Sequence, residues 1–184
     1  IYYMSSKNSI AVFMDGDNIS PNDIPLIIEE IKTHGNIVYN SLFCDMSDKS
    51  KETLQQVCTN NGVSLIHCER ISGKNSTDIK LIVELMNTLY TNKLISLFYI
   101  ITSDSDYRHV IPCIRERGKL IYCIGNQQTN CALQKICHKF TYIETLKKIS
   151  DDIDEKEDNI IKNKYKKEIL NLFKIDDIIN IGHI

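Results

Sequence analysis

The sequence predicts an α/β fold in which a mostly parallel sheet of five to six strands carries helices on both faces. Short apolar runs alternate along the chain with amphipathic segments of helical length, which is the pattern of successive βαβ units. Two of these runs are Ile10–Met14 and Leu94–Ile101, and the first is apolar without interruption, as strands buried on both faces are. Each of the two runs is followed at once by an acidic stretch.

Proline and glycine residues that start or end helices divide the first half of the chain into three strands and two helices. Pro21 suits the first turn of a helix, and Gly35 and Gly62 suit the ends of helices. The expected elements, in order, are the strand Ile10–Met14, the helix Ile24–His34, the strand Asn36–Phe43, the helix Lys51–Asn61 and the strand Val63–His67.

The second half repeats the alternation after a polar loop over residues 69–76. Apolar residues then recur at helical spacing, and Gly118 marks the end of a later helix. The expected elements are the helix Thr77–Tyr90, the strand Leu94–Ile101, the helix Tyr107–Arg117, the strand Leu120–Ile124, the helix Cys131–Cys137 and the strand Phe140–Ile143.

The last part of the chain differs in character. Asp151–Asp158 contains six acids and one lysine, and we interpret it as a linker. Ile160–Phe173 has the pattern of an amphipathic, lysine-rich helix. The sequence therefore predicts one domain over residues 9–146 and an extension over residues 147–184, made of an acidic linker and a helix.

Composition limits the classes of function. The net charge of −2 gives no overall signature of nucleic-acid binding, although a local basic rim can still bind RNA. The sequence contains no signal peptide and no apolar stretch long enough to span a membrane, so we expect no membrane contact. The seven cysteines form no C-x-x-C pair, which predicts reduced thiols and an intracellular protein, cytoplasmic or nuclear.

Two pairs of carboxylates stand where strands end. Asp15 and Asp17 follow the first strand, and Asp104 and Asp106 follow the strand Leu94–Ile101. If the strand order reverses between these two strands, their carboxyl ends share one crevice, which is where ligands bind in open α/β sheets. Asp78, in the first turn of its helix, is expected nearby.

A purely structural interpretation also fits these acids. Ser103 and Asp106 have the spacing of a helix capping box, and an acid such as Asp78 is favourable near any helix N-terminus. The second carboxylate pair at another strand end favours a functional site over a set of caps.

Carboxylates gathered in one crevice repel one another. Two unit charges about 4 Å apart cost roughly 4 kcal/mol at an effective dielectric constant near 20. Protonation relieves this repulsion, and so does a hard cation. Because the ligands are oxygen atoms only, the sequence favours Mg²⁺ or Mn²⁺, and such an ion activates phosphodiester or phosphomonoester substrates.

Three motifs resemble the NYN domain family, and specifically the LabA-like branch of the PIN-like nucleases. They are Ile10–Asn18, Gly73–Ile79 and Thr102–Tyr107. Gly118–Gly125 and Cys137–Glu144 also match the family pattern, so the resemblance covers about Ser9 to Leu146. It implies a PIN-like, Rossmann-like fold for this part of the chain.

The resemblance also implies an activity: metal-dependent hydrolysis of phosphodiester bonds in RNA, as an endonuclease acting on single strands. By that likeness, Mg²⁺ or Mn²⁺ is held by the residues that are also catalytic, namely Asp15, Asp78, Asp104 and Asp106. The expected contacts to substrate are Asn18, which also holds the Asp15 loop, and Lys74, Ser103 and Arg108. RNA is the expected partner, and the C-terminal extension offers a place for protein partners.

Two other functions fit parts of the sequence. A domain that keeps the fold without activity would serve as an RNA-binding or scaffolding module. The stretch Asp15–Ile19 also resembles the first motif of haloacid-dehalogenase-type phosphatases, although those proteins usually carry Thr or Val where this chain has Ile19.

Overall fold

The computed structural model describes residues 7–47, 51–69, 76–153, 155–156, 160–161 and 165. The chain divides into two compact units, Ile1–Leu146 and Lys147–Ile184. In the second unit the described residues are helical, including residues 151–153 and 155–156 of the segment predicted to be a linker. The helix predicted over Ile160–Phe173 falls almost entirely outside the described residues.

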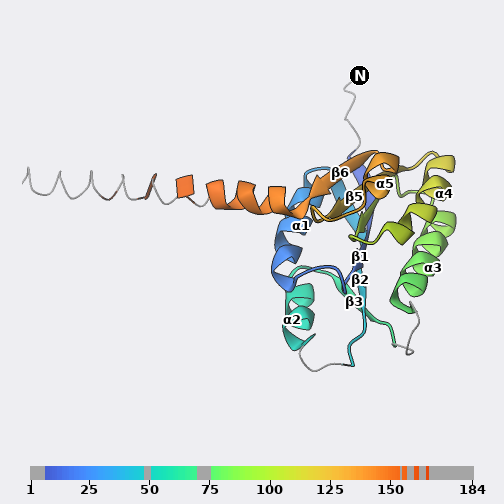
Figure 1. The fold of residues 1–184 in the computed structure, drawn as a ribbon, viewed down its shortest axis with the longest axis horizontal. Coiled ribbons are helices and arrows are strands. Elements are labelled where there is room, and N and C mark those ends of the chain that lie inside the picture. Colours follow the sequence, from blue (N-terminus) through green and yellow to red (C-terminus); the bar gives the residue numbers. More distant parts are fainter. Residues whose placement is uncertain are drawn as a thin grey trace, which may run out of the picture. The chain divides into compact units, whose positions relative to one another are not determined.

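Six parallel strands form one sheet in the first unit, in the order β3-β2-β1-β4-β5-β6 (Figure 1). Every neighbouring pair is parallel, so the predicted α/β architecture is confirmed. The strands are β1 (Asn8–Asp15), β2 (Gly35–Cys44), β3 (Ser64–His67), β4 (Leu97–Ile101), β5 (Leu120–Gly125) and β6 (Lys139–Tyr142).

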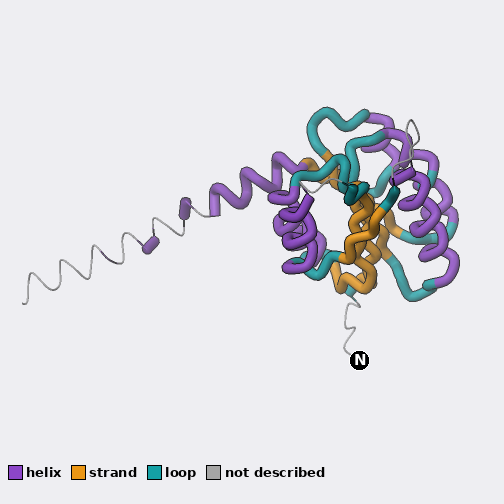
Figure 2. The backbone as a smooth tube through the Cα atoms, turned by 90° about the horizontal axis from the view of Figure 1, so that it is seen from below, coloured by secondary structure: helices purple, strands orange, loops and turns teal. Residues whose placement is uncertain are grey.

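Helices cover both faces of this sheet, as predicted. Figure 1 shows α1 and α2 on one side of the strands and α3 and α4 on the other, and Figure 2 shows the same layers after a turn of 90°. The helices are α1 (Ile24–Lys32), α2 (Glu52–Asn60), α3 (Ser76–Thr91), α4 (Ile111–Glu116) and α5 (Cys131–Ile136), with 3₁₀ turns η1 (Pro21–Asp23) and η3 (Ser105–His109).

β1 lies at the centre of two apolar cores. Its side chains alternate between the faces, so Ile10, Val12 and Met14 pack with α1 and α2, while Ala11 and Phe13 pack with α3 and α4. All five are fully buried, which explains why the strand is apolar without interruption.

The register of β1 and β4 decides where the site lies. Met14 stands opposite Ile101, so both strands end at the same level, with Asp15 next on one and Thr102 next on the other. The strand order also reverses here, because β2 and β3 extend the sheet on one side of β1, and β4, β5 and β6 on the other. The expected parallel neighbours and their shared carboxyl end are confirmed.

The predicted strand Leu94–Ile101 is too long at its start. β4 begins at Leu97, and Leu94 lies in a turn where its backbone N–H donates to the Asn92 side chain (3.2 Å). Leu94 is 84 % exposed. Hydrophobicity alone therefore predicts the wrong start for β4, because it does not distinguish the turn residue Leu94 from the residues of the strand.

The predicted helix Tyr107–Arg117 is wrong as a single element. The chain forms the 3₁₀ turn η3 and then a separate helix, α4, in whose first turn Pro112 lies. Proline has no N–H to donate to the preceding turn, so it starts a helix more readily than it continues one. η3 is therefore a distinct element that carries Asp106 and Tyr107.

All seven cysteines are free thiols, and four of them are buried in the cores. No helix in the described part of the chain is long and apolar enough to cross a membrane.

Two leucines of the same apolar run provide a test of the strand boundary. We expect Leu97→Ala to lower the free energy of unfolding by about 2–5 kcal/mol, because this side chain is fully buried. Leu94→Ala should change it by less than about 0.5 kcal/mol, because the side chain is already in water. Urea denaturation measures both, and equal losses would contradict the boundary described here.

Candidate active site

Asp15 ends β1 with its carboxylate buried, at 1 % exposure. Three neutral groups donate hydrogen bonds to it: the Asn18 side-chain amide to Oδ2 (2.6 Å), the Thr102 hydroxyl to Oδ2 (3.0 Å) and the Asp17 backbone N–H to Oδ1 (3.3 Å). No ion pair between described residues includes Asp15. The carboxylate is thus hydrogen-bonded, but no cation of the described chain balances its charge.

Gly16 allows the chain to turn directly above β2. Its backbone N–H donates to the carbonyl of Phe43 (2.8 Å). A Cβ at this position would lie 2.5 Å from Leu42 Cδ2 and 2.9 Å from Cys44 Cβ, so a larger residue would push the loop away. This close approach keeps Asp17 and Asn18 over the Asp15 carboxylate.

The hydroxyl of Thr102 joins the two predicted acidic stretches. It donates to Asp15 Oδ2 and accepts from the backbone N–H of Asp104 (3.1 Å), and the residue is 1 % exposed. Gly125 supports this arrangement, because a Cβ there would lie 2.6 Å from the Thr102 carbonyl oxygen. One buried side chain therefore fixes the loop after β4 relative to the end of β1.

Asp104 caps the η3 turn. Its Oδ1 accepts from the backbone N–H of Asp106 (2.8 Å), which corrects the expectation that Ser103 is the capping residue. The Ser103 hydroxyl instead accepts from the backbone N–H of Asn126 (3.2 Å). Asp106 is exposed on the same turn.

Asp78 lies in the first turn of α3, a helix that packs in the same apolar core as Tyr107 of η3. Its Oδ1 accepts a hydrogen bond from the hydroxyl of Tyr107 (2.8 Å). Burial raises the pKa of Asp78, the Tyr107 hydrogen bond opposes that rise, and the charges of Asp104, Asp17 and Asp106 add to it. Asp78 is therefore in the electrostatic field of both acidic stretches.

The pKa of Asp15 is also raised. Burial is the main cause, the hydrogen bonds from Asn18 and Thr102 oppose it, and the charge of Asp78 adds to it. The charges of the acids that follow β1 and β4 thus add to the rise in the pKa of Asp78 that burial causes, and Asp78 in turn adds to the rise in the pKa of Asp15. Such a set, at the switch point of a parallel sheet, has the electrostatics typical of a functional site.

The residues predicted to contact substrate lie in different surroundings. Asn18 lies against Asp15, and Ser103 lies beside the β5–α5 loop. Arg108 is exposed on η3, where its Nε donates to His109 Nε2 (3.4 Å). Lys74 lies outside the described residues.

The sequence analysis missed three residues of this region: Thr102, Tyr107 and Lys51. Lys51 forms an ion pair with Asp17, with 3.3 Å between Nζ and Oδ1. Thr102 precedes Asp104 by two residues, a spacing that favours a hydroxyl bond to the backbone N–H and that could have indicated its role. The contacts of Tyr107 and Lys51 join distant segments, and no local signal indicates them.

The donor set suits a hard divalent cation. Asp15, Asp78 and Asp104 offer oxygen atoms only, and burial together with nearby negative charge raises the pKa of Asp15 and Asp78. No group of three or more His, Cys, Asp or Glu side chains within the described ranges is already arranged to hold an ion. Mg²⁺ does not require one, because it keeps several waters and binds through one or two carboxylates.

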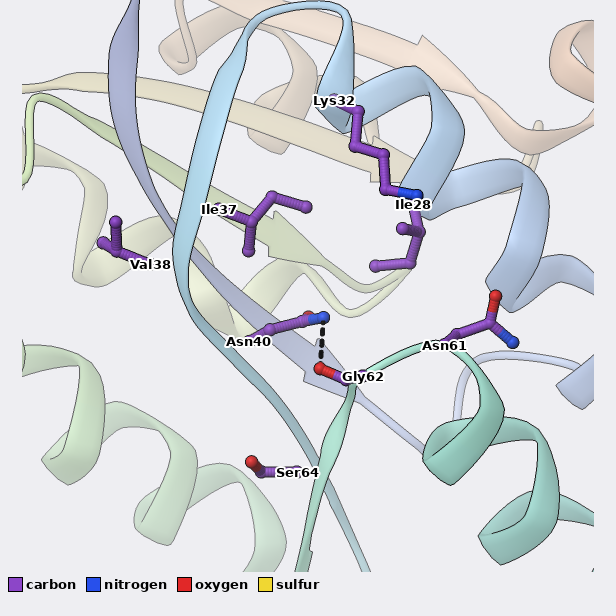
Figure 3. Close-up of a pocket in the computed structure, with 8 residues that line it drawn as sticks. All are labelled: Ile28, Lys32, Ile37, Val38, Asn40, Asn61, Gly62 and Ser64. Carbon is purple, nitrogen blue, oxygen red and sulfur yellow. Dashed lines mark hydrogen bonds between the residues drawn. The ribbon is translucent and has the colours of Figure 1, made fainter.

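A pocket lies at the other end of the strands, between α1, the start of β2 and the turn before β3 (Figure 3). Its volume is about 320 Å³, and Asn40 inside it donates to the Gly62 carbonyl (3.1 Å). Its lining residues are Ile28, Lys32, Ile37, Val38, Asn40, Asn61, Gly62 and Ser64. None of the predicted site residues that the structure describes lines this pocket.

The NYN domain model matches residues 9–144. The chain belongs to the NYN domain family. NYN domains are part of the PIN-like nuclease superfamily, whose members generally use divalent metal ions, so a ribonuclease-type function is supported. The family also favours a nuclease over the phosphatase alternative.

The fold of this NYN domain recurs in a solved structure. A crystal structure of a protein of unknown function from Vibrio parahaemolyticus superposes with a TM-score of 0.64, covering 77 % of this chain and 96 % of that one. The two sequences are 13 % identical, so the likeness concerns the fold alone. No curated protein gives a significant match to the sequence.

The buried Asp15 carboxylate should make stability depend on pH. Because its pKa is raised in the folded protein, folding is favoured while Asp15 is protonated, and this stability is lost as the pH rises through the folded pKa. We expect Asp15→Asn to gain stability relative to wild type as the pH rises from about 3.5 to about 7.5, because the wild type must then bury a charged carboxylate. Urea denaturation in EDTA measures this difference.

Asp45→Asn is the matched control. The pKa of Asp45 is lowered, mainly by hydrogen bonds from the side chain and backbone of Ser47, so the stability that its charge contributes is fully present above its ordinary pKa and is lost only at more acidic pH. This variant should therefore show no gain in stability relative to wild type as the pH rises. If the free energy of unfolding depended on pH in the same way in wild type and Asp15→Asn, Asp15 would not be a buried carboxylate whose charge lacks a compensating cation.

Proposed function

We propose that residues 9–146 form a metal-dependent ribonuclease of the LabA-like branch that cuts single-stranded RNA endonucleolytically. The observation that supports this most strongly is the Thr102 hydroxyl at the switch point of the sheet, which links the Asp15 carboxylate to the backbone N–H of Asp104. If Asp104 were only a helix cap, it would not require the buried carboxylate of Asp15 on the neighbouring strand. Keeping that carboxylate buried has an electrostatic cost that a cap does not explain.

In this proposal Asp15 and Asp104 hold Mg²⁺ or Mn²⁺, and Asp78 and Asp106 assist through water molecules. When bound, such an ion supplies Lewis acidity to a phosphoryl oxygen and makes a neighbouring water more acidic. The protein's task is to keep the carboxylates ionised and oriented, which the donors Asn18 and Thr102 do for Asp15.

Asp78 is suited to assist with proton transfer. One of its oxygens is engaged by Tyr107, and no donor in the described ranges reaches the other. A carboxylate with a raised pKa accepts a proton more readily, so in this proposal Asp78 Oδ2 takes one from the attacking water.

The substrate contacts follow from the same surface. Ser103 accepts from Asn126 and keeps its own O–H for a phosphate oxygen, and Arg108 on the same loop is exposed and always charged. With Lys74, these groups would bind the RNA backbone without reading its sequence. We place protein partners, if the chain has them, on the extension of residues 147–184.

One observation favours a second candidate, an RNA-binding module without activity. One oxygen of Asp104 is occupied as a cap of η3, as the structural interpretation requires. The two candidates differ in their dependence on the carboxylates, because phosphate contacts come from Lys, Arg and hydroxyl groups rather than from acids.

Charge-neutral variants separate these functions. We expect Asp15→Asn and Asp104→Asn each to lower Mn²⁺-dependent cleavage of end-labelled single-stranded RNA by at least about 100-fold, because several kcal/mol of transition-state stabilisation is lost. RNA affinity should persist in both variants, and the melting temperature in EDTA should stay the same or rise. Glu29→Gln, at an exposed site on α1, serves as the control and should cut normally.

The outcome that contradicts the proposal is cleavage by both variants at the wild-type rate, which would leave these acids with a structural role only. Binding of RNA by wild type without cleavage in Mg²⁺ or Mn²⁺ would establish the inactive module. Release of inorganic phosphate from a small phosphomonoester would instead indicate a phosphatase.

A further inference from the structure

The side chain of Tyr107 has a polar group that the apolar core does not need. Its ring is 1 % exposed and packs in the core formed by β1, β4, α3 and α4. A phenylalanine would fill the same space, whereas a buried hydroxyl must have a partner to offset its desolvation. The partner is the Asp78 carboxylate, 2.8 Å away.

This hydrogen bond joins two elements that supply acids to the site. Asp78 begins α3, and Tyr107 lies on η3, directly after Asp106 and three residues after Asp104. The donor is fixed by core packing and the acceptor by the first turn of a helix, so the bond limits the rotation of the Asp78 side chain. One carboxylate oxygen faces the tyrosine, and the other is left for the site.

We propose that Tyr107 is a positioning residue that holds the Asp78 carboxylate in the orientation needed to help bind the divalent cation. The inference rests on the proposed function, because it takes Asp78 as part of the cation site. Groups that orient ligands typically change metal affinity by 10–100-fold when they are removed, which sets the expected size of the effect.

Tyr107→Phe removes the hydroxyl and keeps the ring. We expect the full-length variant to bind Mn²⁺ about tenfold more weakly than wild type in a calorimetric or electron paramagnetic resonance titration at 25 °C. Cleavage of single-stranded RNA should fall at limiting Mn²⁺ and recover toward the wild-type rate at saturating Mn²⁺. A hydroxyl that only stabilises the fold would lower the melting temperature and leave the Mn²⁺ affinity unchanged.

Tyr142→Phe is the matched control. Its hydroxyl donates to the Gln134 side chain (2.9 Å), and no hydrogen bond within the described ranges links it to Asp78 or Asp104. This variant also loses one tyrosine hydroxyl, although its partner is a neutral amide, so it should match wild type in Mn²⁺ affinity. In an Asp78→Asn background, Tyr107→Phe should weaken Mn²⁺ binding no further, because the group it orients is already lost.

The outcomes separate the two levels of the proposal. If wild type binds Mn²⁺ and cuts RNA while Tyr107→Phe binds Mn²⁺ within twofold of wild type, only the role of Tyr107 fails. If wild type neither binds Mn²⁺ nor cuts RNA, the proposed function fails and the role of Tyr107 with it. Should Tyr107→Phe not fold, a crystal structure of the wild type with Mn²⁺ decides: contact between Tyr107 and Asp78 supports the role, and a carboxylate turned away from the hydroxyl overturns it.

Discussion

The carboxylate of Asp15 is the constraint on which the rest of the site depends. It is buried, no ion pair between described residues includes it, and Asn18, Thr102 and the backbone of Asp17 hydrogen-bond to it. Hydrogen bonds from neutral donors lower the cost of such a burial, but they do not balance the charge. A domain that keeps this group at the end of its central strand therefore retains an unbalanced negative charge that an external cation can neutralise.

The parallel sheet makes this arrangement possible. β1 and β4 are neighbours with level ends, so one threonine hydroxyl after β4 reaches the carboxylate after β1 and the backbone of Asp104. The apolar side chains on both faces of β1 hold that register, because a shift by one residue would exchange its two faces. Gly16 and Gly125 then let the surrounding loops approach closely enough to complete the site.

The features that could be predicted from the sequence are those carried by local pattern. The apolar run before Asp15 and the alternation of strands and helices were sufficient to predict the parallel sheet and its switch point. The start of β4 was misplaced because hydrophobicity does not distinguish the turn residue Leu94 from the strand. The break before α4 was missed because an apolar periodicity continues through Pro112.

The contacts that complete the site could not be predicted in the same way. Tyr107 and Asp78 are 29 residues apart in the chain, and Lys51 and Asp17 are 34 apart, so their pairing depends on how helices and turns pack. The predicted cap of η3, Ser103, was wrong by one residue. Ser and Asp are both favourable helix caps, and only the backbone geometry selects Asp104.

The central claim is that the carboxylates at the ends of β1 and β4 attract a divalent cation to this edge of the sheet. Paramagnetic broadening of backbone amide signals by substoichiometric Mn²⁺ tests it directly in the full chain, because the effect falls steeply with distance from the ion. The account predicts that the signals of Gly16, Asp17 and Asp104 broaden first, while those of Asn36 and Ser96 at the opposite end of the strands keep their intensity. Broadening that begins in the acid-rich stretch of residues 151–158 and spares Asp17 and Asp104 would contradict it.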